Sequence, residues 1–340
     1  DPVDSGILDE PCAALLLAEF KQSYINSFPF VIVPVSMDVN TLRQRQPFLF
    51  HSITAVMAYG TPSKQRLLAT ELKNQIASRI IGHSHKSLEI LQGLLVYGAG
   101  SYFFYQPENQ QLAIVLQLCV AMVQDLGLSK NPKATMRKPN SSEDQCGTAF
   151  NTERLAAENR ALLGTYFLTV AFSQAWRKRC TLSHTPFMAQ CAHSLTERPE
   201  QSSDTFISPL IRLSELICRV NNSFSYDDID NAAVKGDIML NLLIANFLSE
   251  LDQIRSSFPA AAKHNTTLNL QCCLLDIWIN ECSLHGALWT SSSEHNVIQV
   301  SLIRIQTLHR CFSAMKSYLN TLIAVPQSSV HNLSFPSWAG

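Results

Sequence analysis

The chain contains few charged residues and none of the short motifs that mark common catalytic sites. Only 16% of its 340 residues are Asp, Glu, Lys or Arg, and the net charge is -1. The sequence therefore has no overall attraction for a phosphate backbone, and we expect any DNA contact to come from another module. G-x-S-x-G, the P-loop, G-x-G-x-x-G and H-E-x-x-H are all missing. These absences leave no basis for naming an enzyme, and we expect the chain not to be one.

Long apolar runs and closely spaced cysteines are also missing. The sequence has no run of eighteen or more apolar residues and no charged-then-apolar leader at its start, so we expect neither membrane spanning nor secretion. Its ten cysteines are spread thinly, and four of them fall on apolar helical stripes: Cys119, Cys218, Cys282 and Cys311. This pattern favours packed thiols in a reducing compartment over a disulfide framework.

The most informative segment that is present runs from Leu88 to Leu128. It contains two apolar helical stretches separated by a polar break, and the second is apolar on every face, which predicts a buried antiparallel hairpin. Gly127 should end the second helix in a left-handed conformation, with Leu128 folded back onto Val123 in a Schellman arrangement. Pro132 prevents the helix from resuming.

The rest of the chain also has helical rather than strand periodicity. We expect an all-α fold, an irregular multi-helix bundle of about ten helices, forming a single domain over residues 1–340 with a long loop at 129–152. The prolines around Phe28–Pro34 predict an extended segment there. The expected helices cover residues 9–27, 48–59, 64–81, 88–103, 109–126, 153–178, 206–222, 236–255, 267–290 and 297–323.

Several stretches together resemble a known family. FPFVIVP at 28–34, QPFLFHSITAV at 46–56, LQGLLVY at 91–97 with QQLAIVLQL at 110–118, and the apolar stretch at 163–191 occur in the order shown by the regulatory, middle homology region of fungal binuclear zinc-cluster transcription factors. The resemblance covers most of residues 10–230. It rests on packing patterns, because none of these stretches is catalytic.

This resemblance implies a nuclear regulatory domain that senses an effector and controls transcription. Its expected partners are a small hydrophobic or acidic effector, a second copy of the chain, and DNA only through a module outside this chain; no membrane is expected. The family's DNA-binding element needs C-x-x-C, which is absent here, so we expect no cofactor in this chain and zinc only in an upstream module. The start at Asp1 favours a fragment. The alternatives are a stand-alone helical enzyme or pathway accessory protein that has lost DNA binding, and a pure interaction module.

Four residues are candidates for ligand binding. Tyr97 and Tyr102 follow a helix that contains Gly93, Gly98 and Gly100, a pattern that indicates either close helix crossing with an aromatic core or an apolar cavity. Arg177 lies where a helix should end, so it either caps that helix or acts as counter-ion for an acidic effector. His285 shares an expected helical stripe with Trp278 and Trp289, and it is either a hydrogen-bonded core histidine or a ligand contact.

Two other groups have metal-binding side chains but unsuitable spacing. Cys180, His184, Cys191 and His193 do not match a tetrahedral zinc site. The acidic stretch Asp227–Asn231 resembles the magnesium motif of all-α terpene cyclases, but no second motif follows it. We expect this stretch to be the acidic turn before the 236–255 helix, with Asp237 as its cap, and we expect no metal site in the chain.

Overall fold

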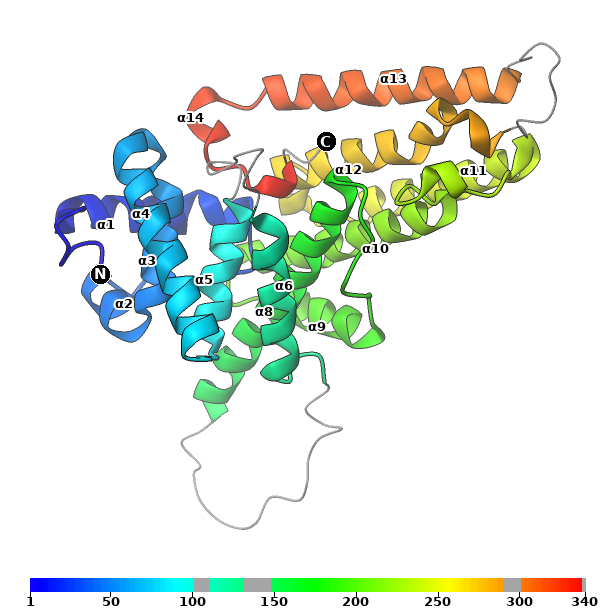
Figure 1. The fold of residues 1–340 in the computed structure, drawn as a ribbon. Coiled ribbons are helices and arrows are strands. Elements are labelled where there is room, and N and C mark those ends of the chain that lie inside the picture. The colour runs from blue at the N-terminus through cyan, green and yellow to red at the C-terminus, as the bar shows by residue number, and fades with distance from the viewer. Residues whose placement is uncertain (101–110, 131–147, 290–300, 338–340) are drawn as a thin grey trace, which may run out of the picture.

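The computed structural model of the chain describes residues 1–100, 111–130, 148–289 and 301–337 (Figure 1). Within these residues every regular element is a helix, which confirms the predicted all-α fold. None of the helices described there is long and apolar enough to cross a membrane. The α-helices are α1 (Glu10–Gln22), α2 (Val39–Arg45), α3 (Pro47–Met57), α4 (Pro62–Gln75), α5 (Leu88–Ala99), α6 (Leu112–Asp125), α8 (Thr148–Ala175), α9 (Pro186–Glu197), α10 (Ile207–Phe224), α11 (Gly236–Ser256), α12 (Thr266–Asn280), α13 (Leu302–Ile323) and α14 (Gln327–Val330).

The predicted hairpin consists of α5 and α6, which pack against each other and against α8 (Figure 1). Every residue of α5 from Ile90 to Ala99 is buried. α6 buries its Leu112, Leu116 and Cys119 stripe, but Ile114 is 63% exposed. The expectation that α6 is enclosed on every face is therefore wrong at Ile114, because α5 and α8 cover only part of its surface.

The end of α6 has the predicted Schellman geometry. Gly127 has φ of +68°, and the amide nitrogen of Leu128 donates to the carbonyl oxygen of Val123 at 3.0 Å. A glycine adopts this left-handed conformation without steric cost, which ends the helix cleanly.

Gly93 in α5 and Gly100 at its end allow α3 to cross α5 closely. A Cβ at Gly93 would lie 2.5 Å from the Phe48 ring, and a Cβ at Gly100 would lie 2.7 Å from Val56. Both distances are too short for a real Cβ contact. Close helix crossing therefore accounts for two of the three glycines in this segment.

The segment at Phe28–Pro34 is non-helical, as predicted, and most of it is buried, although its end at Pro34 is exposed. The rings of Phe28 and Phe30 are completely buried, and the Phe30 ring lies 5.2 Å from that of Phe167 on α8. Gly164 makes this approach feasible, because a Cβ there would lie 2.6 Å from the Cβ of Phe30. This segment thus joins the N-terminal helices to α8.

A buried ion cluster fixes α8 against the segment before α10. Arg160 donates from Nε and Nη2 to the two oxygens of Asp204, both at 2.8 Å, and from Nη2 to Glu200 at 2.7 Å. Asp204 also accepts from the backbone nitrogens of Glu200 and Gln201. Because both charged groups are paired and hydrogen-bonded, their burial is tolerated.

The C-terminal part of the chain adds a layer in which α12 packs against α10, α11 and α13. α13 runs along the outer edge of this layer (Figure 1). Leu270 and Leu274 of α12, Tyr318 of α13 and Leu333 form a second, smaller apolar cluster. The segment after α13 then returns towards α5 and α12.

Several predicted boundaries differ from the structure. The helix expected over 267–290 ends at Asn280, and short 3-10 turns follow it. His285 and Trp289 therefore do not share a helical stripe with Trp278. Three helices, α2, α9 and α14, were not predicted. α8 begins at Thr148, inside the loop expected at 129–152, most of which lies outside the described residues.

Candidate functional site

The four predicted ligand-binding residues lie in different settings. Tyr97 is on α5 with 5% of its surface exposed, and burial raises the pKa of its hydroxyl to about 12. Tyr102 lies outside the described residues. Arg177 and His285, which are over a hundred positions apart in the chain, meet around one carboxylate, that of Glu281.

The Arg177 cluster combines an ion pair with aromatic rings. Arg177 follows α8 with φ of +48°, and its guanidinium donates to the carboxylate of Glu281. The same guanidinium lies 5.3 Å from the ring centre of Trp278 and 5.8 Å from that of Tyr226. These distances are typical of cation–π contacts. His285 completes the cluster, with Nε2 3.5 Å from Oε1 of Glu281.

Charge balance limits what this cluster can bind. Burial by itself would raise the pKa of Glu281, but the neighbouring His285 and Arg177 hold it below its ordinary value. Glu281 therefore stays ionised and neutralises Arg177. An acidic ligand at Arg177 would have to compete with a carboxylate that is already in place.

The four candidate zinc ligands are not gathered into one group. Cys191 is buried on α9, and His184 has its ring 5.6 Å from that of Tyr166. His193 pairs with Glu197 at 3.1 Å on the surface. No set of three or more metal-binding side chains occurs in the part of the chain that the structure describes.

The acidic stretch after α10 is occupied by protein contacts. Asp227 accepts from Nε of Arg179 at 2.6 Å, and Asp228 accepts from Asn231 at 2.8 Å. The expected cap of α11 is wrong, since Lys235 occupies the N-cap position and Asp237 lies inside the first turn. α11 begins at Gly236, one residue before Asp237, and Gly236 itself has φ of +74°.

A cavity of about 540 Å³ next to the Arg177 cluster was missed by the sequence analysis. We call it the thiol cavity, because Cys180 and Cys218 both line it, together with Trp278. The hydroxyl of Tyr166 donates to Sγ of Cys218 at 3.8 Å. A hydrogen bond from Cys218 lowers the pKa of Cys180 to about 6 and raises that of Cys218. Nothing in the spacing of the two cysteines indicates that they meet.

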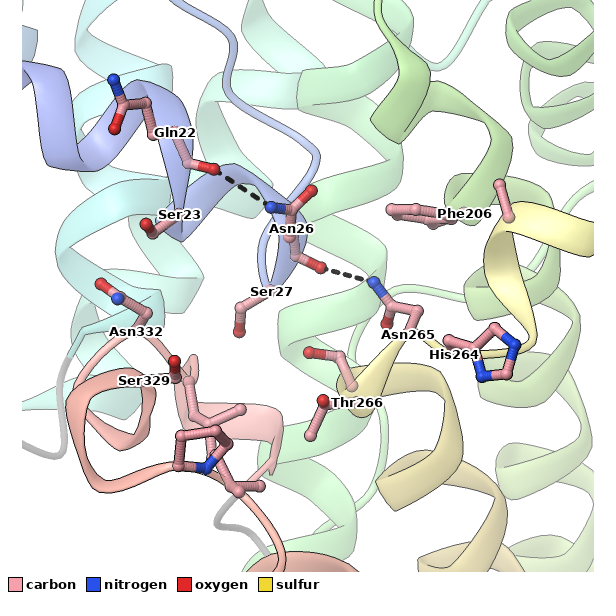
Figure 2. Close-up of a pocket in the computed structure, with 15 residues that line it drawn as sticks. Gln22, Ser23, Asn26, Ser27, Phe206, His264, Asn265, Thr266, Ser329 and Asn332 are labelled. Atoms are coloured by element: carbon pink, nitrogen blue, oxygen red, sulfur yellow. Dashed lines mark hydrogen bonds between the residues drawn. The ribbon is translucent and has the colours of Figure 1, made fainter.

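A second cavity, of about 420 Å³, lies where three distant parts of the chain meet. We call it the terminal-segment pocket. Residues 22–27 form one wall, residues 261–267 another and residues 325–333 a third, and Figure 2 shows their side chains around a common opening. The lining is mostly uncharged and hydrogen-bonding, with apolar surface from Phe206, Val325 and Leu333.

Hydrogen bonds connect the three walls of the terminal-segment pocket. Nδ2 of Asn265 donates to the carbonyl oxygen of Asn26 at 3.0 Å (Figure 2). Behind the pocket, the backbone nitrogen of Ser334 donates to Oγ of Ser27 at 2.6 Å. The N-terminal and C-terminal segments are therefore held to each other and to the start of α12.

This pocket also contains unsatisfied polar groups. Thr266 and Thr267 are the first two residues of α12, and their backbone N–H groups have no acceptor among the described residues. Asn265 caps the helix by accepting from Leu268 instead. Oδ1 of Asn332, also in the lining, is buried with no hydrogen-bond partner in the described part of the chain. The pocket thus offers two donors at a positive helix end and one acceptor.

Comparison with known proteins places the chain in a family. The model of the WAR1 C-terminal domain matches residues 1–335. The chain belongs to the WAR1 C-terminal domain family. This confirms the predicted resemblance to the regulatory region of fungal transcription factors. No solved structure matches the chain.

The curated relatives of this WAR1-type domain are fungal regulators. The chain is 25% identical to transcription factor opdL of Penicillium oxalicum over 98% of its own length and 59% of that protein. It is 26% identical to transcription factor himD of Aspergillus japonicus over 96% of its length and 53% of that protein. An alignment of 135 residues, which covers 37% of the chain and 14% of weak acid resistance protein 1 of Saccharomyces cerevisiae, has 30% identity. The chain thus spans little more than half of the first two relatives, and it is a transcription regulatory domain.

Proposed function

We propose that this regulatory domain responds to a small organic acid bound in the terminal-segment pocket. The observation that carries the proposal is that Thr266 and Thr267, whose backbone N–H groups have no acceptor among the described residues, both line a partly apolar pocket. A carboxylate is the natural ligand for free amides at the start of a helix. Phe206, Val325 and Leu333 would contact the apolar part of the acid.

Two further points support an acid as the effector. One relative is named a weak acid resistance protein. In addition, the Arg177 cluster is a poorer carboxylate site than the start of α12, because Glu281 already neutralises Arg177. The earlier prediction of a small hydrophobic or acidic effector is kept, with its position moved from Arg177 to α12.

Ligand binding in this pocket acts by shifting the population of two arrangements. The ligand contacts residues 22–27 and 325–333 together, so it favours the arrangement in which the C-terminal segment is docked. α13 leads directly into that segment, so in this proposal α13 moves when the segment moves. In this proposal the full protein acts in the nucleus, contacts DNA through a zinc-cluster module outside this chain, and has no enzymatic activity of its own.

The proposal is tested by thermal unfolding and calorimetry with hexanoate and benzoate as probes. An acid at about a hundredfold its Kd adds roughly 2.7 kcal/mol of stability, which raises Tm by several degrees. The key variant is Thr266→Pro, which removes one N–H. Proline is tolerated at the first position of a helix, and Asn265 has the extended backbone (φ -74°, ψ 118°) that proline requires of its predecessor.

The matched control is Leu302→Pro, which removes the same amide at the first position of α13. We expect Thr266→Pro to have the Tm of the wild type without ligand and to lose most of the rise in Tm that the acid causes. Leu302→Pro should retain that rise. If neither acid raises the Tm of the wild type, or if both variants respond as the wild type does, the pocket is not the effector site.

A further inference from the structure

α13 has two apolar faces, and the described residues cover only one of them. Thr307, Cys311, Ala314 and Tyr318 are buried against the rest of the fold. A second stripe lies on another side of the helix and is solvent-exposed, with Phe312 at 60% and Ile323 at 79% exposed. Its members are Ile305, Phe312, Met315, Leu319 and Ile323. Because α13 lies along the outer edge of the molecule (Figure 1), no other described helix covers this stripe.

The spacing of the exposed stripe suits a second helix. Ile305, Phe312 and Leu319 recur every seven residues, the period at which one helix keeps contact with another along its length. A row of this kind is recognised by apolar residues at intervals of three and four on the partner. A contiguous row of exposed apolar side chains is also costly to leave in water, which indicates an interaction site.

The charges on α13 define what the partner must carry. Between Leu302 and Ile323 there are three Lys or Arg residues and no Asp or Glu. Lys316 is exposed and lies four residues after Phe312 and three before Leu319, on the edge of the stripe. Arg304 and Arg310 already face acceptors of the domain itself, so the charge complementarity rests on Lys316, which an acidic side chain would pair with and a second Lys316 would repel.

A membrane surface is a weaker match than an acidic helix. Recognition of anionic lipid usually needs a cluster of about four to eight basic residues. α13 has three, and Nε of Arg304 is already bonded to the carbonyl oxygen of Ser283 at 2.8 Å. Arg310 is near Asp276 of α12, which offsets its charge.

We infer that the exposed face of α13 binds an amphipathic helix of a partner protein, with apolar residues along one side and acidic residues flanking them. This interaction goes beyond effector binding and does not depend on it. It gives the domain a protein-docking surface formed mainly by Phe312, Leu319 and Ile323, with Lys316 selecting acidic partners.

The probe is a fluorescent helical peptide of about five turns, with Leu at heptad-spaced positions and Glu beside them. One control peptide has Lys in place of Glu, and another has the acidic sequence scrambled. Binding to the full chain is followed by fluorescence anisotropy at low and high salt. The variants are Phe312→Ser and Lys316→Glu, and the matched control is Leu15→Ser, which changes another exposed leucine, on α1.

We expect the acidic peptide to bind more tightly than either control, and more weakly at high salt. Phe312→Ser and Lys316→Glu should each weaken it roughly tenfold or more, and Leu15→Ser should not. Equal binding of all peptides, or of all variants, contradicts the inference.

Three other results would also overturn it. If the wild type sediments as a dimer and Phe312→Ser as a monomer, the face binds a second copy of the chain. If the wild type binds phosphatidylserine vesicles but no peptide, and Phe312→Ser loses the vesicle binding, the face binds a membrane. If the wild type binds no peptide and Phe312→Ser lowers the Tm by several degrees, the face packs against another part of the chain.

Discussion

The stability of this domain should fall in mild acid because of one buried histidine. His51 on α3 is completely buried. Its Nε2 lies 2.9 Å from the carbonyl oxygen of Leu68, and its Nδ1 lies 2.9 Å from Nε2 of Gln75. Nε2 donates to this carbonyl oxygen and Nδ1 accepts from the amide nitrogen of Gln75, so the ring is neutral in this arrangement.

The size of the effect follows from the pKa of this ring. Burial lowers the pKa of His51 from 6.5 to about 4. The unfolded chain therefore takes up a proton at higher pH than the folded chain does. Stability is complete above about pH 6.5 and declines as the pH falls towards 4. The gap between the two pKa values corresponds to roughly 3 kcal/mol over that interval.

The assay is urea denaturation followed by circular dichroism at a series of pH values between 7 and 4. His51→Gln keeps an uncharged donor and acceptor at this position, so its free energy of unfolding should depend less on pH than that of the wild type. The difference in free energy of unfolding between the wild type and His51→Gln should change by roughly 3 kcal/mol between pH 7 and pH 4. His264→Gln, which replaces an exposed ring, should leave the wild-type profile unchanged. A difference between wild type and His51→Gln that is constant over the whole pH range would refute the reasoning.

Two further predictions concern buried polar groups. Arg160→Met leaves the carboxylate of Asp204 buried with only backbone donors, so it should cost about 3–5 kcal/mol in urea denaturation, and Asp204→Leu in the same chain should recover part of this. A single-variant cost under about 1 kcal/mol would contradict the role of the buried ion cluster. Because Cys218 lowers the pKa of Cys180 to about 6, iodoacetamide should alkylate Cys180 rapidly at pH 7 and slowly below pH 6. Cys218→Ala should slow the reaction at pH 7 roughly tenfold or more, as measured by mass spectrometry; an unchanged rate would show that the two thiols do not interact.

Local patterns predicted the helices well where the signal was strong. α1 begins at Glu10, next to the predicted start at residue 9, where Asp9 accepts from the backbone nitrogen of Cys12 at 2.7 Å. Gly127 ends α6 in the predicted conformation. The predictions were poorer where tertiary contacts decide the outcome. Apolar spacing continues past Asn280, but the chain there turns into short 3-10 segments.

The candidate site could be predicted only in part. Arg177 and His285 were selected separately, for reasons of charge and of position, and the fold brings both to Glu281, which the sequence analysis had not considered. The terminal-segment pocket had no signal in the sequence, because its polar side chains are ordinary residues from three separate segments. No local pattern states which of these segments will meet.

The amino-acid sequence by itself determined the helical class, the buried hairpin and the family, because periodicity, helix-ending residues and the order of apolar segments are properties of neighbouring residues. Tertiary structure alone decided which face of α13 stays exposed, which carboxylate neutralises Arg177, and which segments meet the start of α12 around a pocket. The physical reason is that burial and pairing depend on contacts between residues far apart in the chain, and a linear pattern does not encode these contacts one by one.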